Sequence, residues 1–226
     1  MMHDIVFLFD VDNTLLNNDR VQADLDVHIG IEHGAAARKR YWEIFEQLRD
    51  ELGYADYLGA LERYRLEDMH DPRLLRISNW LVDYPFSDRL YRGALDAVKH
   101  VQQLAPTVIL SDGDAVFQPR KVCSSGLWGA FDGHVLIYVH KEEELDDVAR
   151  LYPAKHYVMI DDKLRILDSM KKSWGDRLTT VFPRQGHYAV DPEILAQYPH
   201  GDIQLEHIGD LVNYDLGDLI GQPKGR

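Results

Sequence analysis

The most constraining feature of the sequence is a short apolar run that ends abruptly in polar side chains. Residues 5–9 are uniformly apolar and rich in β-branched and aromatic side chains, which is typical of a strand buried on both faces of a parallel sheet. Ligands bind at the carboxyl ends of the strands in such sheets, so two carboxylates at this point predict a functional site. The alternative is a plain polar turn, because Asp, Asn and Thr all favour turns. The segment that follows the run is Asp10-Val11-Asp12-Asn13-Thr14.

A long helical stretch follows this first strand. Residues 35–52 repeat apolar side chains at helical spacing before Gly53, and shorter candidate helices cover residues 54–67 and 73–82. The stretch is too long for an ordinary connection between a strand and a helix. We therefore predict a helical cap domain over residues 17–84 and a core domain of residues 1–16 and 85–226. The alternative is that these helices only extend the core.

The rest of the chain alternates between strands and helices. We predict strands at residues 107–110, 134–139, 156–160 and 178–182, with an edge strand at 203–205, and helices at 94–104, 142–151 and 163–174. This alternation predicts an α/β fold with a Rossmann-like parallel sheet and right-handed crossovers. The glycine-rich tail after Asp215 is expected to be loose.

Three of the predicted strands end in reactive side chains, and a lysine follows a fourth. A parallel sheet brings the carboxyl ends of its strands to one edge, so these groups should meet. Such a set suits phosphoryl transfer, in which one Asp attacks phosphorus and a second protonates the leaving oxygen. Carboxylate oxygens suit Mg²⁺, and a hydroxyl and a lysine would hold the phosphate oxygens. The residues are Asp10, Asp12, Ser111, Lys141, Asp161 and Asp162.

These features resemble the haloacid dehalogenase (HAD) superfamily, on its phosphatase side. The insert after the first strand resembles the helical cap of that family. The match covers residues 5–182 and lies in four motifs that occur in the right order: Asp10-Val11-Asp12-Asn13-Thr14 as Asp-x-Asp-x-Thr, then Ser111, Lys141 and the acidic pair Asp161-Asp162.

The resemblance implies a role for each matching residue. Asp10 would be the nucleophile and a metal ligand. Asp12 would be the general acid/base, and its backbone carbonyl a metal ligand. Ser111 and the amide of Asp112 would bind the phosphoryl group, while Lys141 would hold both phosphate and nucleophile.

The acidic pair would complete the Mg²⁺ site. Asp162 is favoured as the direct ligand, because it aligns with the Asp of the family's Gly-Asp motif. Asp161 would act through water or by pairing with Lys141. The sequence departs from many relatives in having Asp112 where they have Asn and Ile166 where they have an acid.

Other polar residues are expected to have ordinary roles. Lys121 could be a second cation beside the phosphate, but a solvated lysine on a helix is the preferred interpretation. Cys123 is expected to be a small buried residue. The loop at residues 184–187 is as well explained by plain surface as by a border of the pocket. The eleven His have no metal-ligand spacing, which disfavours zinc.

Composition limits the partners of the chain. A net charge of −13 and a pI near 5.2 disfavour general binding to nucleic acid or an anionic membrane. No secretory signal or membrane-length apolar run is visible, and the single cysteine excludes an internal disulfide. We therefore expect a cytoplasmic protein.

The favoured function is a Mg²⁺-dependent phosphatase that acts on a small phosphorylated metabolite through an aspartyl phosphate. The alternatives are a 2-haloacid dehalogenase, which needs neither a metal nor a leaving-group acid of this kind, and a catalytically silent HAD-like binding protein. The natural substrate and the oligomeric state do not follow from the sequence.

Overall fold

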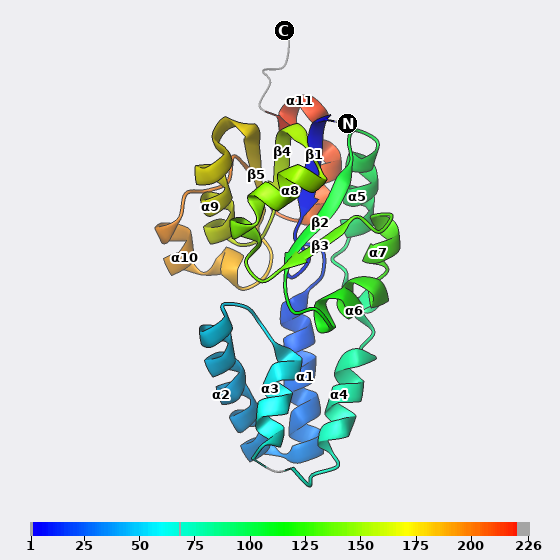
Figure 1. Cartoon of the computed structure of the whole chain (residues 1–226), viewed down its shortest axis with the longest axis vertical. Helices are drawn as coiled ribbons and strands as arrows, with labels where there is room; N and C mark the ends of the chain where they lie inside the picture. Colours follow the sequence, from blue (N-terminus) through cyan, green and yellow to red (C-terminus); the bar gives the residue numbers. More distant parts are fainter. Residues whose placement is uncertain (1, 68, 221–226) are drawn as a thin grey trace.

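The protein forms an α/β fold around one parallel sheet (Figure 1). The computed structural model describes residues 2–67 and 69–220. Within this part of the chain the sheet has six strands in the order β3-β2-β1-β4-β5-β6, and every neighbouring pair is parallel. The predicted fold class is confirmed. The strands are β1 (His3–Phe9), β2 (Thr107–Asp112), β3 (Val135–Tyr138), β4 (Ala154–Ile160), β5 (Leu178–Pro183) and β6 (Ile203–Leu205).

Strand β1 lies in the middle of the sheet. Phe7 is in register with Thr107 of β2 on one side and with Val158 of β4 on the other. Phe7 and Phe9 pack into one apolar cluster, and the alternating residues Val6 and Leu8 pack into a second cluster on the opposite face. Both faces of β1 are covered, so its side chains are apolar without alternation.

Helices cover both faces of the sheet. The face of Phe7 packs against α5 (Ala94–Gln102), α6 (Phe117–Ser124), α7 (Leu127–Ala130), the 3₁₀ helix at Ile208–Asn213 and α11 (Leu216–Leu219). The face of Val6 packs against α8 (Leu145–Leu151), α9 (Leu164–Trp174) and α10 (Pro192–Gln197). This is the layered arrangement expected of a parallel sheet with crossover helices.

The insert between β1 and β2 is helical, as predicted. It contains α1 (Asn18–His33), α2 (Ala35–Leu52), α3 (Tyr57–Arg65) and α4 (Leu74–Val82), which form a lobe below the carboxyl ends of the strands (Figure 1). Helix α2 has the predicted bounds, and its C-cap Gly53 adopts a left-handed conformation with φ of 79°. The division into a cap of residues 17–84 and a core of residues 1–16 and 85–226 stays a prediction.

The cap packs on the core through aromatic side chains. The ring of Tyr57 in α3 lies 5.5 Å from that of Phe117 in α6 and 4.9 Å from that of Phe45 in α2. Gly53 also lies against the ring of His140, close enough that a Cβ atom at Gly53 would be 2.4 Å from His140 Cε1. The two lobes are therefore in direct contact beside the edge of the sheet.

Several predicted elements differ from the structure. The helix predicted at residues 54–67 is shorter and spans Tyr57–Arg65. The helix expected at residues 142–151 begins only at Leu145, because Lys141–Glu143 form a 3₁₀ turn first. The expectation of a loose tail after Asp215 is wrong for Leu216–Leu219, where Asp215 caps a helical turn; residues 221–226 lie outside the described part. In that part, none of the helices combines the length and apolarity needed to cross a membrane.

Candidate active site

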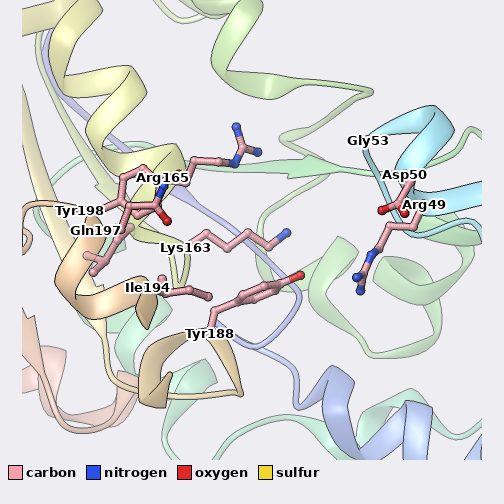
Figure 2. A pocket seen from close by; sticks show the side chains of 10 residues that line it. Arg49, Asp50, Gly53, Lys163, Arg165, Tyr188, Ile194, Gln197 and Tyr198 are labelled. Atoms are coloured by element: carbon pink, nitrogen blue, oxygen red, sulfur yellow. The ribbon is translucent and has the colours of Figure 1, made fainter. Parts of the chain in front are cut away.

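The carboxyl ends of the strands face the cap, and a cavity of about 320 Å³ opens between the two lobes. Figure 2 shows Lys163 and Tyr188 on its core side and Arg49 on its cap side. Lys163 directly follows the acidic pair Asp161-Asp162. The cavity therefore lies beside the residues that the sequence singled out.

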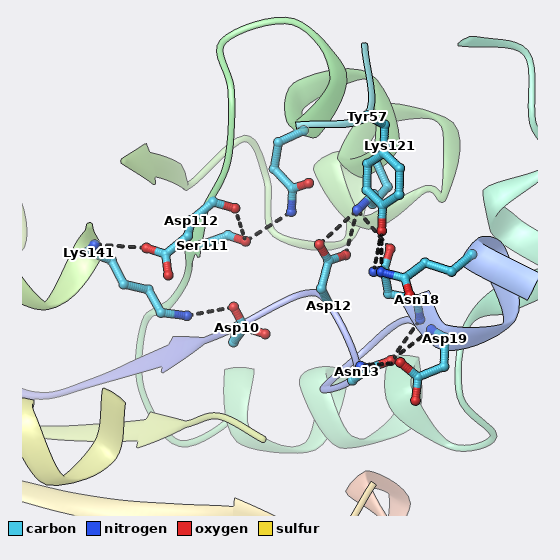
Figure 3. Close-up of polar contacts among 12 residues, drawn as sticks. Asp10, Asp12, Asn13, Asn18, Asp19, Tyr57, Ser111, Asp112, Lys121 and Lys141 are labelled. Carbon is cyan, nitrogen blue, oxygen red and sulfur yellow. Dashed lines mark hydrogen bonds and ion pairs between the residues drawn. The ribbon is translucent and has the colours of Figure 1, made fainter. Parts of the chain in front are cut away.

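Lys141 and Asp10 form the centre of the site (Figure 3). Lys141 Nζ lies 2.5 Å from Asp10 Oδ1 and 2.7 Å from Asp161 Oδ2, and it donates to the carbonyl of Leu110 at 3.2 Å. Burial lowers the pKa of Lys141, but the negative charges of Asp10, Asp161 and Asp112 raise it by more than burial lowers it. The net shift of the pKa is upward, so the amino group stays charged. The predicted alternative that Asp161 pairs with Lys141 is what the structure shows.

Asp10, Asp161 and Asp162 form a buried acidic cluster. One carboxylate oxygen of each lies within 4.8 Å of the others. Asp10 Oδ2 and both carboxylate oxygens of Asp162 are buried without a hydrogen-bond partner in the described residues. Burial, with the neighbouring charge of Asp161, holds the pKa of Asp162 well above its usual range.

This cluster fits a hard divalent cation. Buried carboxylate oxygens without donors are costly unless a cation or protons neutralise them, and oxygen ligands of this kind suit Mg²⁺. The carboxylate of Asp12 lies outside the cluster, so its part in a metal site rests on its backbone carbonyl and stays a prediction. Both oxygens of Asp162 lack a hydrogen-bond partner in the described residues, whereas Asp161 is engaged with Lys141 and with the amide of Lys163.

Ser111 and Asp112 end strand β2 beside Lys141. Ser111 Oγ is buried and accepts a hydrogen bond of 3.0 Å from Gln118 Nε2. The Asp112 carboxylate accepts the amide of Lys141 at 2.8 Å, and burial raises its pKa. The extra acid at position 112 therefore fixes the loop that carries Lys141.

Asp12 is held by a buried lysine, which corrects the expectation for Lys121. The Lys121 side chain is 1% exposed, and its Nζ lies 2.7 and 2.8 Å from the two carboxylate oxygens of Asp12. Lys121 also donates to Asn18 Oδ1 at 3.1 Å, and Asn18 donates to the hydroxyl of Tyr57. Lys121 is thus not a solvated lysine. It connects Asp12 to the cap (Figure 3).

The loop between β5 and α10 supports the first motif. Gln185 is buried, and its Nε2 donates to the carbonyls of Asn13 and Thr14. Thr14 Oγ1 in turn accepts the amide of Asp162 at 3.0 Å. Asn13 has a left-handed φ of 62°, and its amide oxygen caps the start of α1. The loop at residues 184–187 therefore supports the backbone of the first motif through Gln185 and is more than plain surface.

Lys163 is a site residue that the sequence reading missed. Burial lowers the pKa of Lys163, but the negative charges of Asp162, Asp10 and Asp161 raise it by more than burial lowers it. The net shift of the pKa is therefore upward. The available signal was a basic residue that directly follows an acidic pair at a strand end. For Lys121 the signal was its spacing, since it lies one helical turn after the buried Phe117.

Two remaining expectations have a clear outcome. Cys123 is exposed, so the expectation of a buried cysteine is wrong. Ile166 is fully buried in the apolar cluster under α9, so its position contributes packing and no charge.

Comparisons with known proteins show which solved structures the chain resembles. No family model matches it, and a search of curated proteins finds no match. Among solved structures, a haloacid dehalogenase-like hydrolase from Burkholderia xenovorans LB400 is 64% identical, with a TM-score of 0.91, over 94% of this chain and 97% of that one.

More distant structures share the fold. A HAD-hydrolase from Bacillus subtilis bound to magnesium is 17% identical over 93% of this chain and 98% of that one, with a TM-score of 0.63. The L-2-haloacid dehalogenase of Xanthobacter autotrophicus is 17% identical over 94% and 98%, with a TM-score of 0.62. The 64% identity over nearly the whole length of both chains shows that this chain belongs to the haloacid dehalogenase-like hydrolases.

Proposed function

We propose that the protein is a Mg²⁺-dependent phosphomonoesterase that acts on a small phosphorylated metabolite. The observation that carries this proposal is the buried cluster of Asp10, Asp161 and Asp162, with carboxylate oxygens that lack donors. A dehalogenase attacks carbon with its aspartate and has no use for a cation-binding cluster. The magnesium-bound HAD-hydrolase of B. subtilis supports the same choice of metal.

Asp10 is the nucleophile in this proposal. Lys141 holds its Oδ1, while its Oδ2 has no hydrogen-bond partner in the described residues. A carboxylate oxygen attacks phosphorus, the bond from phosphorus to the leaving oxygen breaks, and an aspartyl phosphate forms. A Mg²⁺ ion held by Asp10, Asp162 and the carbonyl of Asp12 would neutralise charge between the nucleophile and the phosphate.

Asp12 moves the protons. It gives a proton to the leaving oxygen and later takes one from the water that attacks phosphorus, which releases phosphate and restores Asp10. Lys121 Nζ contacts both oxygens of the Asp12 carboxylate and so fixes the position of the side chain that transfers these protons. Ser111, the amide of Asp112 and Lys141 hold the remaining phosphate oxygens.

The closed contact between the lobes favours a small substrate. A cavity of about 320 Å³ lies at the lower end of the range for small-molecule sites. Gly53 of the cap rests on His140, next to Lys141. A cap closed in this way excludes water from the reacting groups.

The test is an assay of purified protein with p-nitrophenyl phosphate and with 2-chloropropionate. We expect phosphate release that depends on Mg²⁺ and stops on chelation, with no chloride release. Chloride release that persists after chelation would establish the dehalogenase instead. Binding of phosphorylated metabolites without turnover of either substrate would establish the silent binding protein.

A further inference from the structure

More basic than acidic side chains line the cavity between the lobes, although the protein as a whole is strongly acidic. Its lining includes Arg49, Lys163 and Arg165, against one acid, Asp50. The whole chain has a net charge of −13. A local concentration of cations in a cleft focuses the field there and attracts anions.

Lys163 is the cation that is free to bind a ligand. Within the described residues, the Lys163 Nζ has no carboxylate oxygen within 4.0 Å, the limit for an ion pair. It also makes no hydrogen bond there. The Nζ stands 5.6 Å from the centre of the Tyr188 ring. Figure 2 shows the amino group of Lys163 and the hydroxyl of Tyr188 pointing together toward the cap.

The two arginines differ from Lys163 and from each other. Arg165 is ion-paired with Glu142 at 2.5 Å, and the Glu142 side chain is 7% exposed, so Arg165 is already neutralised. Arg49 pairs with Glu46 at 2.6 Å across an exposed turn of α2. A pair of that kind is weak in water and easily exchanged for a ligand. Arg49 reaches into the cavity opposite Lys163 and Tyr188 (Figure 2).

We propose that the leaving group of the substrate carries a second anionic group, a carboxylate or a phosphate, that binds between Lys163 and Arg49. This inference rests on the proposed phosphatase function and adds the substrate class. The carbon skeleton lies against the ring of Tyr188. Only a closed cap brings Arg49 to the anion, so this group on the substrate also stabilises closure.

Lys163 and Arg49 are separate from the groups that hold the transferred phosphate. Ser111 and Lys141 come from the end of β2 and the turn after β3, whereas Lys163 follows β4. Arg49 belongs to the cap. A cation that held the transferred phosphate would act on every substrate alike, whereas a cation that binds the leaving group acts only on anionic leaving groups.

The test compares matched substrates with wild type and two variants. Glycerate 3-phosphate against glycerol 3-phosphate reports on a carboxylate, and propane-1,3-diol bisphosphate against 3-hydroxypropyl phosphate reports on a second phosphate. The variants are Lys163→Gln and Arg49→Gln. Lys155→Gln is the matched control, because it removes one positive charge at a 69% exposed side chain paired with Asp4, on the opposite end of the sheet.

We expect wild type and Lys155→Gln to prefer the anionic member of one pair. Lys163→Gln and Arg49→Gln should each reduce that preference in kcat/KM by about 10- to 100-fold, because each removes a charge-assisted hydrogen bond to the second anion. The change should appear mainly in KM. Arg49→Gln keeps the test valid if Lys163→Gln folds poorly, since Arg49 is on the surface.

Other outcomes separate the two levels of the proposal. If wild type hydrolyses both members of each pair equally well, the second anion is wrong and the phosphatase stands. If the variants lower kcat/KM equally for both members, Lys163 and Arg49 do not bind the leaving group. If wild type hydrolyses no phosphate ester, the proposed function fails, and the inference fails with it.

Discussion

Asp10 is held between a cation and two further acids, and this determines what its removal does. Lys141 touches both Asp10 and Asp161, so Asp10→Asn leaves Lys141 with a partner and removes one of three crowded carboxylates. We expect kcat to fall by at least about 10³-fold and the melting temperature of the metal-free protein to stay or rise slightly. Asp4→Asn, at an exposed position of the same strand, is the control for both measurements. Near-normal turnover in Asp10→Asn would show that the nucleophile is assigned wrongly.

Lys121 is expected to matter for stability and for activity. Replacing a buried lysine that grips a carboxylate breaks an ion pair. Because the Asp12 side chain is 23% exposed, the cost should be about 2 kcal/mol, less than for a fully buried pair. Urea unfolding of Lys121→Met measures this cost, and turnover should fall because Asp12 loses its position.

A double-mutant cycle separates the pair from the packing of Lys121. Lys121→Met should cost much less stability in an Asp12→Asn background than in wild type. An equal cost in both backgrounds would mean that the lysine stem, rather than its charge, stabilises the protein.

The sequence predicts site residues well where the strand pattern places them. Asp10, Ser111 and Asp161 follow recognisable strands, and parallel strands bring their ends together. The expectation of a solvated Lys121 is wrong because the burial of a lysine depends on a partner from a distant element, here Asp12. The place of Lys163 in the site does not follow from the sequence, because Lys163 lines a cavity that exists only when the cap packs on the core.

At the scale of elements, the contact between the end of α2 and the turn before Lys141 is the most sensitive to change. A Cβ atom at Gly53 would lie 2.4 Å from His140 Cε1, so either the imidazole must turn away or the cap must move. We expect Gly53→Ala to hold the cap away from the core and to lower kcat/KM by about 10-fold or more, because water then enters the site.

Gly126→Ala is the matched control for this prediction. Gly126 has a left-handed conformation with φ of 84° and ψ of −4°, close to the 79° and 2° of Gly53, but a Cβ there meets nothing within 4 Å. Both variants should lose about 1 kcal/mol of stability from the left-handed conformation. If the two variants also lose activity equally, the contact with His140 has no role in catalysis.

Replacement of the insert by a Gly/Ser linker is the wider form of this test. The hydrophobic cluster that contains Phe9 of β1 continues into the cap through Tyr57. Removal of the cap therefore exposes apolar surface on the core. A single substitution at Gly53 leaves that surface covered and addresses closure alone.

The bounds of a helix or strand can be predicted from the sequence where the residues that set them lie within that element. Helix α2 was predicted with its bounds because its apolar stripe and terminal glycine both lie within the helix. The start of α8 at Leu145 was not, because the turn at Lys141–Glu143 is shaped by the contact of the Lys141 amide with Asp112. The helical turn near residue 216 depends on burial of Leu219 against the distant core.

At the scale of the whole molecule, the acidic cluster links metal binding to pH. Burial raises the pKa of Asp161 and Asp162 in the folded protein. The folded metal-free protein therefore holds protons that the unfolded chain has released. The free energy of unfolding of the metal-free protein should fall as pH rises from the ordinary carboxylate pKa toward the raised values.

Mg²⁺ should reverse this loss. The rise in melting temperature that Mg²⁺ produces should be larger at about pH 8 than at about pH 5, because binding must displace the protons. Calorimetric titration in two buffers of different ionisation enthalpy should show proton release near neutral pH. Asp162→Asn should abolish the release, and a buffer-independent heat in wild type would contradict the assignment of the metal site.

The central position of β1 has a consequence for how the chain acquires its site during translation. β1 leaves the ribosome before the other five described strands, yet one of its two neighbours is β4, whose Ala154 is in register with His3. Until β4 emerges, an apolar strand has an unpaired edge, which exposes the nascent chain to aggregation. The cap helices lie between the two strands in sequence and can associate earlier by local contacts. Asp161 and Asp162 directly follow β4, so the strand that completes the sheet around β1 also delivers the acids that complete the cluster. A translation product that ends before β4 therefore cannot assemble the acidic cluster.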